Sequence, residues 1–94
     1  MNFKEHTTFM IDFISDFVDG EIERYFFDLD YSAYVIEHFP HMELENTRLA
    51  DKFSYTIDRA YERGTDLGLS DEEFRVEISN ALNEWLGKKK PYII

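Results

Sequence analysis

The sequence predicts an all-α fold, a single small bundle of about four helices. Apolar residues recur every three or four positions over most of the chain, and helix-capping residues separate these segments. No stretch shows the alternating pattern of a strand. The 94 residues are 44% hydrophobic and include nine Phe, six Tyr and one Trp, enough apolar material for a core. Because no repeat or linker interrupts the chain, we expect residues 1–94 to form one domain.

The first predicted helix begins at Thr7 or Thr8, whose hydroxyl groups suit an N-cap. Its apolar positions are Met10, Phe13, Ile14, Phe17, Val18 and Ile22, and the pattern carries on towards Tyr25 and Phe26. Gly20 either ends this helix after Val18 or lies inside it at a cost of about 1 kcal/mol against Ala. The unbroken periodicity favours a continuous helix.

A short second helix is expected over residues 31–38, capped by Asp30 and ended by Pro40. Tyr34, Val35 and Phe39 would turn inward. The third helix begins at Asn46 or Thr47 and ends at Gly64, where a left-handed C-cap residue is expected. Its apolar stripe consists of Leu49, Phe53, Ile57 and Ala60.

The fourth helix has the clearest boundaries. Ser70 and Glu73 form a capping box, and Gly87, followed by three lysines, suits the C-terminal end. Its apolar positions are Phe74, Ile78, Leu82 and Trp85. Trp85 and Phe53 are therefore predicted core residues, and residues 91–94 are expected to add an extended segment that docks on the bundle.

The net charge limits the kinds of partner that the protein can bind. Twenty Asp and Glu against ten Lys and Arg give a net charge of -10 and a pI near 4.6, which disfavours direct contact with nucleic acid or anionic membranes. Cysteine is absent, so neither disulfides nor thiolate chemistry is expected. No apolar run is long enough for a membrane span or a signal peptide. These features predict a cytoplasmic protein.

Four acids in the first predicted helix repeat at i, i+4, i+7 and i+11, which places them within about 60° of one another on a continuous helix. They are Asp12, Asp16, Asp19 and Glu23. The fourth helix carries a similar acidic set, Glu73, Glu77 and Glu84. Such rows are ordinarily a solvated face. Because neither row contains an interleaved Lys or Arg, we also interpret all seven acids as candidate partner-binding residues.

The basic residues gather in the third predicted helix, at Arg48, Lys52, Arg59 and Arg63. Pairing with acidic neighbours in the bundle is the favoured interpretation, and a phosphate-binding patch is the alternative. Asp51, Asp58 and Glu62 beside this row weaken that alternative.

Catalytic and metal-binding patterns are sparse. His38 and His41 with Glu37 and Glu43 suggest metal ligands, but Pro40 interrupts the helix needed to place both histidines on one face. His6 has no partner identifiable from sequence. Nucleotide-binding and nucleophile motifs are absent. We therefore predict no catalytic residue, no metal and no cofactor.

In size, acidity and helical pattern the chain is similar to the small acidic inhibitors that microbes and phages direct at nucleic-acid enzymes, such as nuclease immunity, anti-restriction and anti-CRISPR proteins. No motif places it in any of these groups. The expected function is a protein-binding inhibitor or regulator, of the nucleic-acid-mimic type, that occupies the basic surface of a nucleic-acid-binding protein. The alternative is a structural or regulatory homodimer without catalytic activity, which uses an exposed aromatic patch of Phe26, Phe27 and Tyr31. A third class, a metal protein or small enzyme, would need residues 38–45 to meet another acid.

Overall fold

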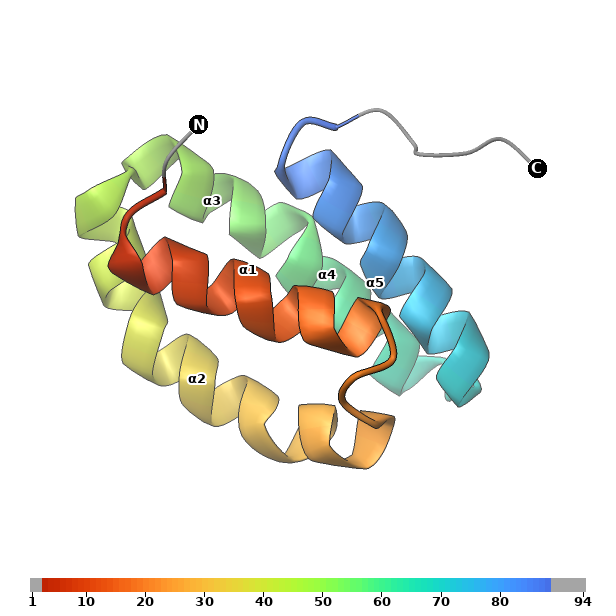
Figure 1. The fold of residues 1–94 in the computed structure, drawn as a ribbon. Helices are drawn as coiled ribbons and strands as arrows, with labels where there is room; N and C mark the ends of the chain where they lie inside the picture. Colours follow the sequence, from red (N-terminus) through yellow and green to blue (C-terminus); the bar gives the residue numbers. More distant parts are fainter. Residues whose placement is uncertain (1–2, 89–94) are drawn as a thin grey trace.

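Five α-helices make up the part of the chain that the structure, a computed structural model, describes, residues 3–88 (Figure 1). They are α1 (Glu5–Val18), α2 (Arg24–Glu45), α3 (Thr47–Tyr55), α4 (Ile57–Asp66) and α5 (Asp71–Trp85). α1 packs against α2 on one side and α5 on the other, with α3 and α4 behind it (Figure 1). The predicted all-α class is confirmed.

The core is built largely from aromatic rings. Phe17, Phe27 and Phe74 are fully buried, and the rings of Phe17 and Phe27 stack with centroids 4.1 Å apart. Tyr31 donates a hydrogen bond to Asp58 at 2.9 Å, and burial together with this carboxylate raises the pKa of its hydroxyl. The predicted exposed patch is therefore wrong for Phe27 and Tyr31, and of its three residues Phe26 alone is exposed.

Phe53 and Trp85 form the other end of the core, as predicted. Each is 1% exposed, and their rings meet edge to face with centroids 5.2 Å apart. The indole N–H of Trp85 donates to the carbonyl oxygen of Leu49 at 2.9 Å, so the polar edge of the buried ring is satisfied.

The first helix differs from the prediction at both ends. Lys4 is its N-cap, and Thr7 lies buried inside the first turn rather than at the cap. The helix ends at Val18 because Gly20 takes a φ of +87°, a left-handed conformation that turns the chain towards α2. The prediction of a continuous helix through Gly20 is wrong.

The second helix is much longer than the predicted segment of residues 31–38. It begins at Arg24, with Glu23 as N-cap, and continues through Pro40 to Glu45. A proline inside a helix leaves the carbonyl four residues earlier without its N–H partner. Pro40 and Ile36 both lie on the outer side of the helix, so water can reach that carbonyl oxygen. Tyr34, Val35 and Phe39 pack against the core, as predicted.

The third predicted helix is two helices. Asn46 caps α3 by accepting from the backbone N–H of Leu49 at 3.1 Å, as expected. Thr56 then interrupts the helix, and its hydroxyl donates to the carbonyl of Lys52 at 2.6 Å. Gly64 is not a C-cap, because α4 continues past it and its Cα lies buried against the ring of Phe74.

The last helix follows the prediction closely. Ser70 and Glu73 form both hydrogen bonds of the capping box, at 3.2 and 3.0 Å. Gly87 adopts a φ of +72°, and the N–H of Lys88 donates to the carbonyl of Asn83 at 2.8 Å, which ends the helix. The predicted extended segment 91–94 lies outside the described residues. Within residues 3–88, no helix combines the length and the apolar character needed to cross a bilayer.

Candidate functional site

The first set of predicted partner-binding acids lies on the outer side of α1 and the turn that follows it. Asp12, Asp16, Asp19 and Glu23 are all exposed, and we call them the acidic face. Asp12 and Asp16 lie one turn apart on α1, and Asp19 follows as its C-cap. Glu23 does not continue the same helical row, because the chain turns at Gly20 and Glu23 becomes the N-cap of α2.

The turn keeps Glu23 near the end of α1. The backbone carbonyl of Asp16 accepts hydrogen bonds from the N–H groups of Glu21 and Ile22, at 2.8 and 3.2 Å, so the chain folds back on the last turn of the helix. Glu21 is also exposed and adds a fifth carboxylate to this surface. The turn therefore places Glu23 close to Asp16 and Asp19 at the end of α1, while Asp12 lies one turn earlier in the middle of the helix. Glu23 joins the set through this turn and not through the predicted helical register.

The acids of the acidic face have no cationic partner within the described residues. The segment 5–23 contains no Lys or Arg. In residues 3–88, none of the ion pairs within 4 Å involves Asp12, Asp16, Asp19 or Glu23. These four acids therefore form no ion pair within residues 3–88, although Asp19 shares a surface groove with Arg75 and Lys88.

Arg24, which follows Glu23 in the chain, and Arg75, which contacts the end of α1, both interact with core residues. Arg75 of α5 donates to the carbonyl of Phe17, and its guanidinium lies 4.4 Å above the ring of the same residue. Arg24 donates to the carbonyl of Leu69 and lies 4.2 Å above the ring of Phe74. Arg24 also forms ion pairs with Asp28 and Asp71, each at 3.4 Å. The contacts of the two arginines hold α1 and α2 against α5.

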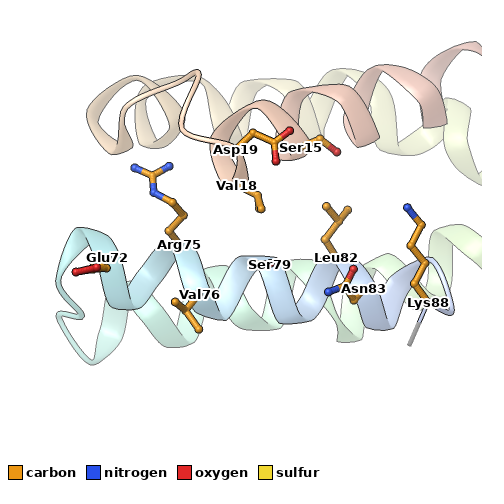
Figure 2. A pocket seen from close by; sticks show the side chains of 10 residues that line it. All are labelled: Ser15, Val18, Asp19, Glu72, Arg75, Val76, Ser79, Leu82, Asn83 and Lys88. Carbon is orange, nitrogen blue, oxygen red and sulfur yellow. The ribbon is translucent and has the colours of Figure 1, made fainter. Parts of the chain in front are cut away.

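An open surface groove of about 540 Å³ lies between α1 and α5, beside the acidic face (Figure 2). Asp19 and Ser15 border it from α1, while Arg75 and Lys88 border it from the side of α5. The groove contains both signs of charge together with Val18 and other apolar groups. The purely acidic surface therefore stops at this groove.

The second predicted set does not join the first. Glu73 is occupied in the capping box of α5. Glu77 and Glu84 lie on the opposite flank of α5, where they line a groove of about 320 Å³ with Arg59 and Arg63 of α4. No pair of these charges lies within 4 Å in residues 3–88, so the groove juxtaposes opposite charges without closed ion pairs.

The predicted basic row is divided by the break at Thr56. Arg59 and Arg63 lie on α4, whereas Arg48 and Lys52 lie on α3 and border a separate groove beside Trp85. The prediction of one continuous basic row is therefore wrong. The favoured pairing with acidic neighbours is not observed either, because none of the ion pairs within 4 Å in residues 3–88 involves these four residues.

All three histidines meet between the start of α1 and the second half of α2, which the sequence did not indicate. The Nδ1 atoms of His6 and His38 lie 2.8 Å apart, and the ring of His41 stacks on that of His6 with centroids 4.2 Å apart. Burial, with His6 and His41 nearby, lowers the pKa of His38, although Glu37 acts in the opposite direction. A helix that continues through Pro40 would have placed His38 and His41 on the same helix, α2. The sequence prediction missed this because it ended the helix at Pro40.

The described residues contain no group of three or more His, Cys, Asp or Glu side chains arranged to hold a metal ion. Comparisons with protein-family models, with curated proteins and with solved structures gave no match.

Proposed function

We propose that this chain is a small acidic protein that binds another protein and inhibits or regulates it, with the acidic face seated on a basic, nucleic-acid-binding surface. The observation that carries the proposal is that the four exposed acids of the acidic face have no ion-pair partner in residues 3–88. Arg75, which borders the same groove as Asp19, donates to the carbonyl of Phe17 instead. A basic partner would supply the missing charges.

The spacing of the acids supports mimicry of a nucleic-acid backbone. Asp12, Asp16 and Asp19 are separated by about 6 and 4.5 Å along the helix axis, at 1.5 Å per residue. A rigid row of carboxylates at this spacing presents a continuous negative edge to a cleft that ordinarily holds phosphates. The net charge of -10 would speed the encounter with a basic partner.

The proposal assigns binding rather than catalysis to the protein, and no cofactor. We place its action in the cytoplasm, because the sequence contains no cysteine and its proposed partners handle nucleic acid. Glu77 and Glu84 are secondary candidates, since Arg59 and Arg63 share their groove.

A pair of variants with equal net charge tests the proposal. One replaces the acidic face, as Asp12→Asn, Asp16→Asn, Asp19→Asn and Glu23→Gln. The control neutralises four exposed acids elsewhere, as Glu43→Gln, Asp51→Asn, Glu62→Gln and Asp66→Asn. A partner is first captured from the native host and identified by mass spectrometry, and its association rate with each protein is then measured at two salt concentrations.

We expect the captured partner to be basic and nucleic acid to compete for it. The acidic-face variant should associate more slowly and show a weaker salt dependence, while the control variant should resemble wild type more closely. Equal effects of the two variants would mean that only overall charge matters. A partner that binds equally well in all three forms would contradict the proposal.

A further inference from the structure

The outer face of α2 carries a continuous row of exposed apolar residues. Figure 1 shows α2 along the edge of the bundle, with α1 beside it. We call the row the outer seam, and its members are Phe26, Leu29, Ala33, Ile36, Pro40 and Leu44. Leu44 and Ile36 are 86% and 76% exposed, so these side chains project into solvent along nearly the whole helix.

The outer seam is directed away from the core. At 100° per residue, its six members fall within about 80° of one another, roughly opposite the buried face that includes Phe27, Tyr31 and Met42. No charged residue falls within this arc, although 32% of the chain is charged. Monomeric proteins rarely leave an uncharged apolar strip of this length uncovered.

The order of residues along the outer seam is nearly symmetric about a point between residues 34 and 35. Reflection through that point brings Phe26 close to Leu44, Leu29 to Pro40, and Ala33 to Ile36. A two-fold dimer requires such a self-complementary surface, because each contact occurs twice with the two chains exchanged. The small Ala33 beside the axis leaves space for Ile36 of the other copy.

We propose that the outer seam is a dimer interface, in which two copies of this chain pack their α2 helices antiparallel across a two-fold axis. Flanking charges permit this arrangement: Glu37 is level with Ser32 of the second copy, and Asp30 is level with Phe39 and Pro40. No acid of α2 is level with an acid of the second copy. The inference uses a different surface from the acidic face and does not depend on the proposed function.

The available area suits a dimer. If a large apolar side chain carries about 200 Å², the exposed fractions of Phe26, Leu29, Ile36 and Leu44 with the two smaller residues amount to roughly 600 Å² per copy. Flanking side chains such as Tyr25, 69% exposed, extend this area towards the about 800 Å² per partner of a standard interface. The strip spans about 27 Å from Phe26 to Leu44, which is long enough for a stable helix pair.

Sedimentation velocity and light scattering over a range of concentrations test the dimer. Leu29→Glu and Leu67→Glu make a matched pair, because both leucines are 62% exposed and each change adds one negative charge, but Leu67 lies outside the seam at the end of α4. We expect wild type and Leu67→Glu to dimerise and Leu29→Glu to raise the dimer Kd about tenfold or more. Circular dichroism should show all three folded.

The antiparallel pairing has its own test. Phe26→Lys and Leu44→Glu should each weaken self-association. An equimolar mixture should dimerise better than either variant alone, because the ammonium group introduced into one chain would face the carboxylate introduced into the other. A parallel pair would gain nothing from mixing. The salt dependence of association distinguishes this interface from the acidic face. Added salt should strengthen the dimer, because it screens the repulsion between two chains that each carry a net charge of -10.

Wild type that stays monomeric at all concentrations would overturn the proposal and leave a different protein as the occupant of the seam. A dimer that Leu29→Glu and Leu67→Glu disturb equally would overturn the assignment to α2. Neither result bears on partner capture by the acidic face.

Discussion

The carboxylate of Glu45, the last residue of α2, accepts hydrogen bonds from the backbone N–H and the hydroxyl of Thr7, at 2.9 and 2.7 Å. Its second oxygen accepts from the backbone N–H of His6 at 2.8 Å. The first turn of α1 is thus capped by a residue 38 positions later in the chain. This long-range cap explains why Thr7 lies inside the helix and not at its end.

Glu45→Ala is expected to lower the free energy of unfolding by about 1–2 kcal/mol, because the N–H groups of His6 and Thr7 lose a charged acceptor. Denaturant unfolding followed by circular dichroism measures the change. Glu43→Ala is the control, since Glu43 is an exposed acid near the same end of α2. Equal stabilities of the two variants would show that the cap contributes nothing.

The histidine cluster predicts a loss of stability in mild acid. Burial first, then His6 and His41, lower the pKa of His38 below its ordinary 6.5, while Glu37 and Glu45 oppose the shift. The folded state therefore favours neutral His38, so its contribution is complete above pH 6.5 and is lost as the pH falls below that value.

Unfolding measured between about pH 8 and 5 should show this decline in stability, and His38→Gln should flatten it. An unchanged slope in His38→Gln would exclude the histidine cluster as the cause.

Glu45 acts in a separate, more acidic range. Burial alone would raise the pKa of its carboxyl group, but the hydrogen bonds from Thr7 and His6 lower this pKa below 4.5. The contribution of Glu45 to stability is therefore present above about pH 4.5 and is lost on further acidification.

Trp85→Ala should cost about 3–5 kcal/mol, because the ring is 1% exposed and its removal leaves a cavity beside Phe53. Trp85→Phe should cost less, since it mainly removes the hydrogen bond to the carbonyl of Leu49. Chemical denaturation distinguishes these two losses, and a near-wild-type stability of Trp85→Ala would contradict the assignment to the core.

Local signals in the sequence predicted the elements whose ends are set locally. The capping box of Ser70 and Glu73 and the cap at Asn46 satisfy backbone groups within three residues, so both could be identified without the fold. The core positions of Phe53 and Trp85 could be predicted from helical periodicity, which is also a local property of the sequence.

Elements whose ends depend on tertiary contacts were not predictable in this way. Pro40 continues α2 because its face is turned outward, and α1 begins before Thr7 because Glu45 supplies the cap. The candidate site was predicted in part: Asp12, Asp16 and Asp19 followed from spacing, while the position of Glu23 depends on the turn at Gly20. The outer seam and the histidine cluster both required the full length of α2.

Gly20→Ala should destabilise the protein by about 1 kcal/mol, because residue 20 has a φ of +87° that a side chain disfavours. The site is open, with no atom within 4 Å of a new Cβ, so the cost is conformational and not steric. Gly20→Asn should cost less, since Asn tolerates the left-handed region. A rise in melting temperature for Gly20→Ala would show that α1 continues through the turn.

Gly64→Ala should destabilise the protein for a different reason. Gly64 has helical backbone in α4, where Ala alone would gain about 1 kcal/mol of helix propensity. A Cβ at this position would, however, overlap the ring of Phe74, which is fully buried. Tyr61 packs against that ring from α4, and the guanidinium of Arg24 covers its face, so the ring has little freedom to move.

We therefore expect a net loss of about 1–3 kcal/mol for Gly64→Ala, measured by denaturant unfolding. Phe74→Leu provides the decisive comparison, because a smaller side chain leaves space for the added methyl group. Gly64→Ala introduced into the Phe74→Leu background should cost less than in wild type, and the difference is the coupling energy between the two positions. If the cost is the same in both backgrounds, contact with Phe74 is not what requires glycine at position 64.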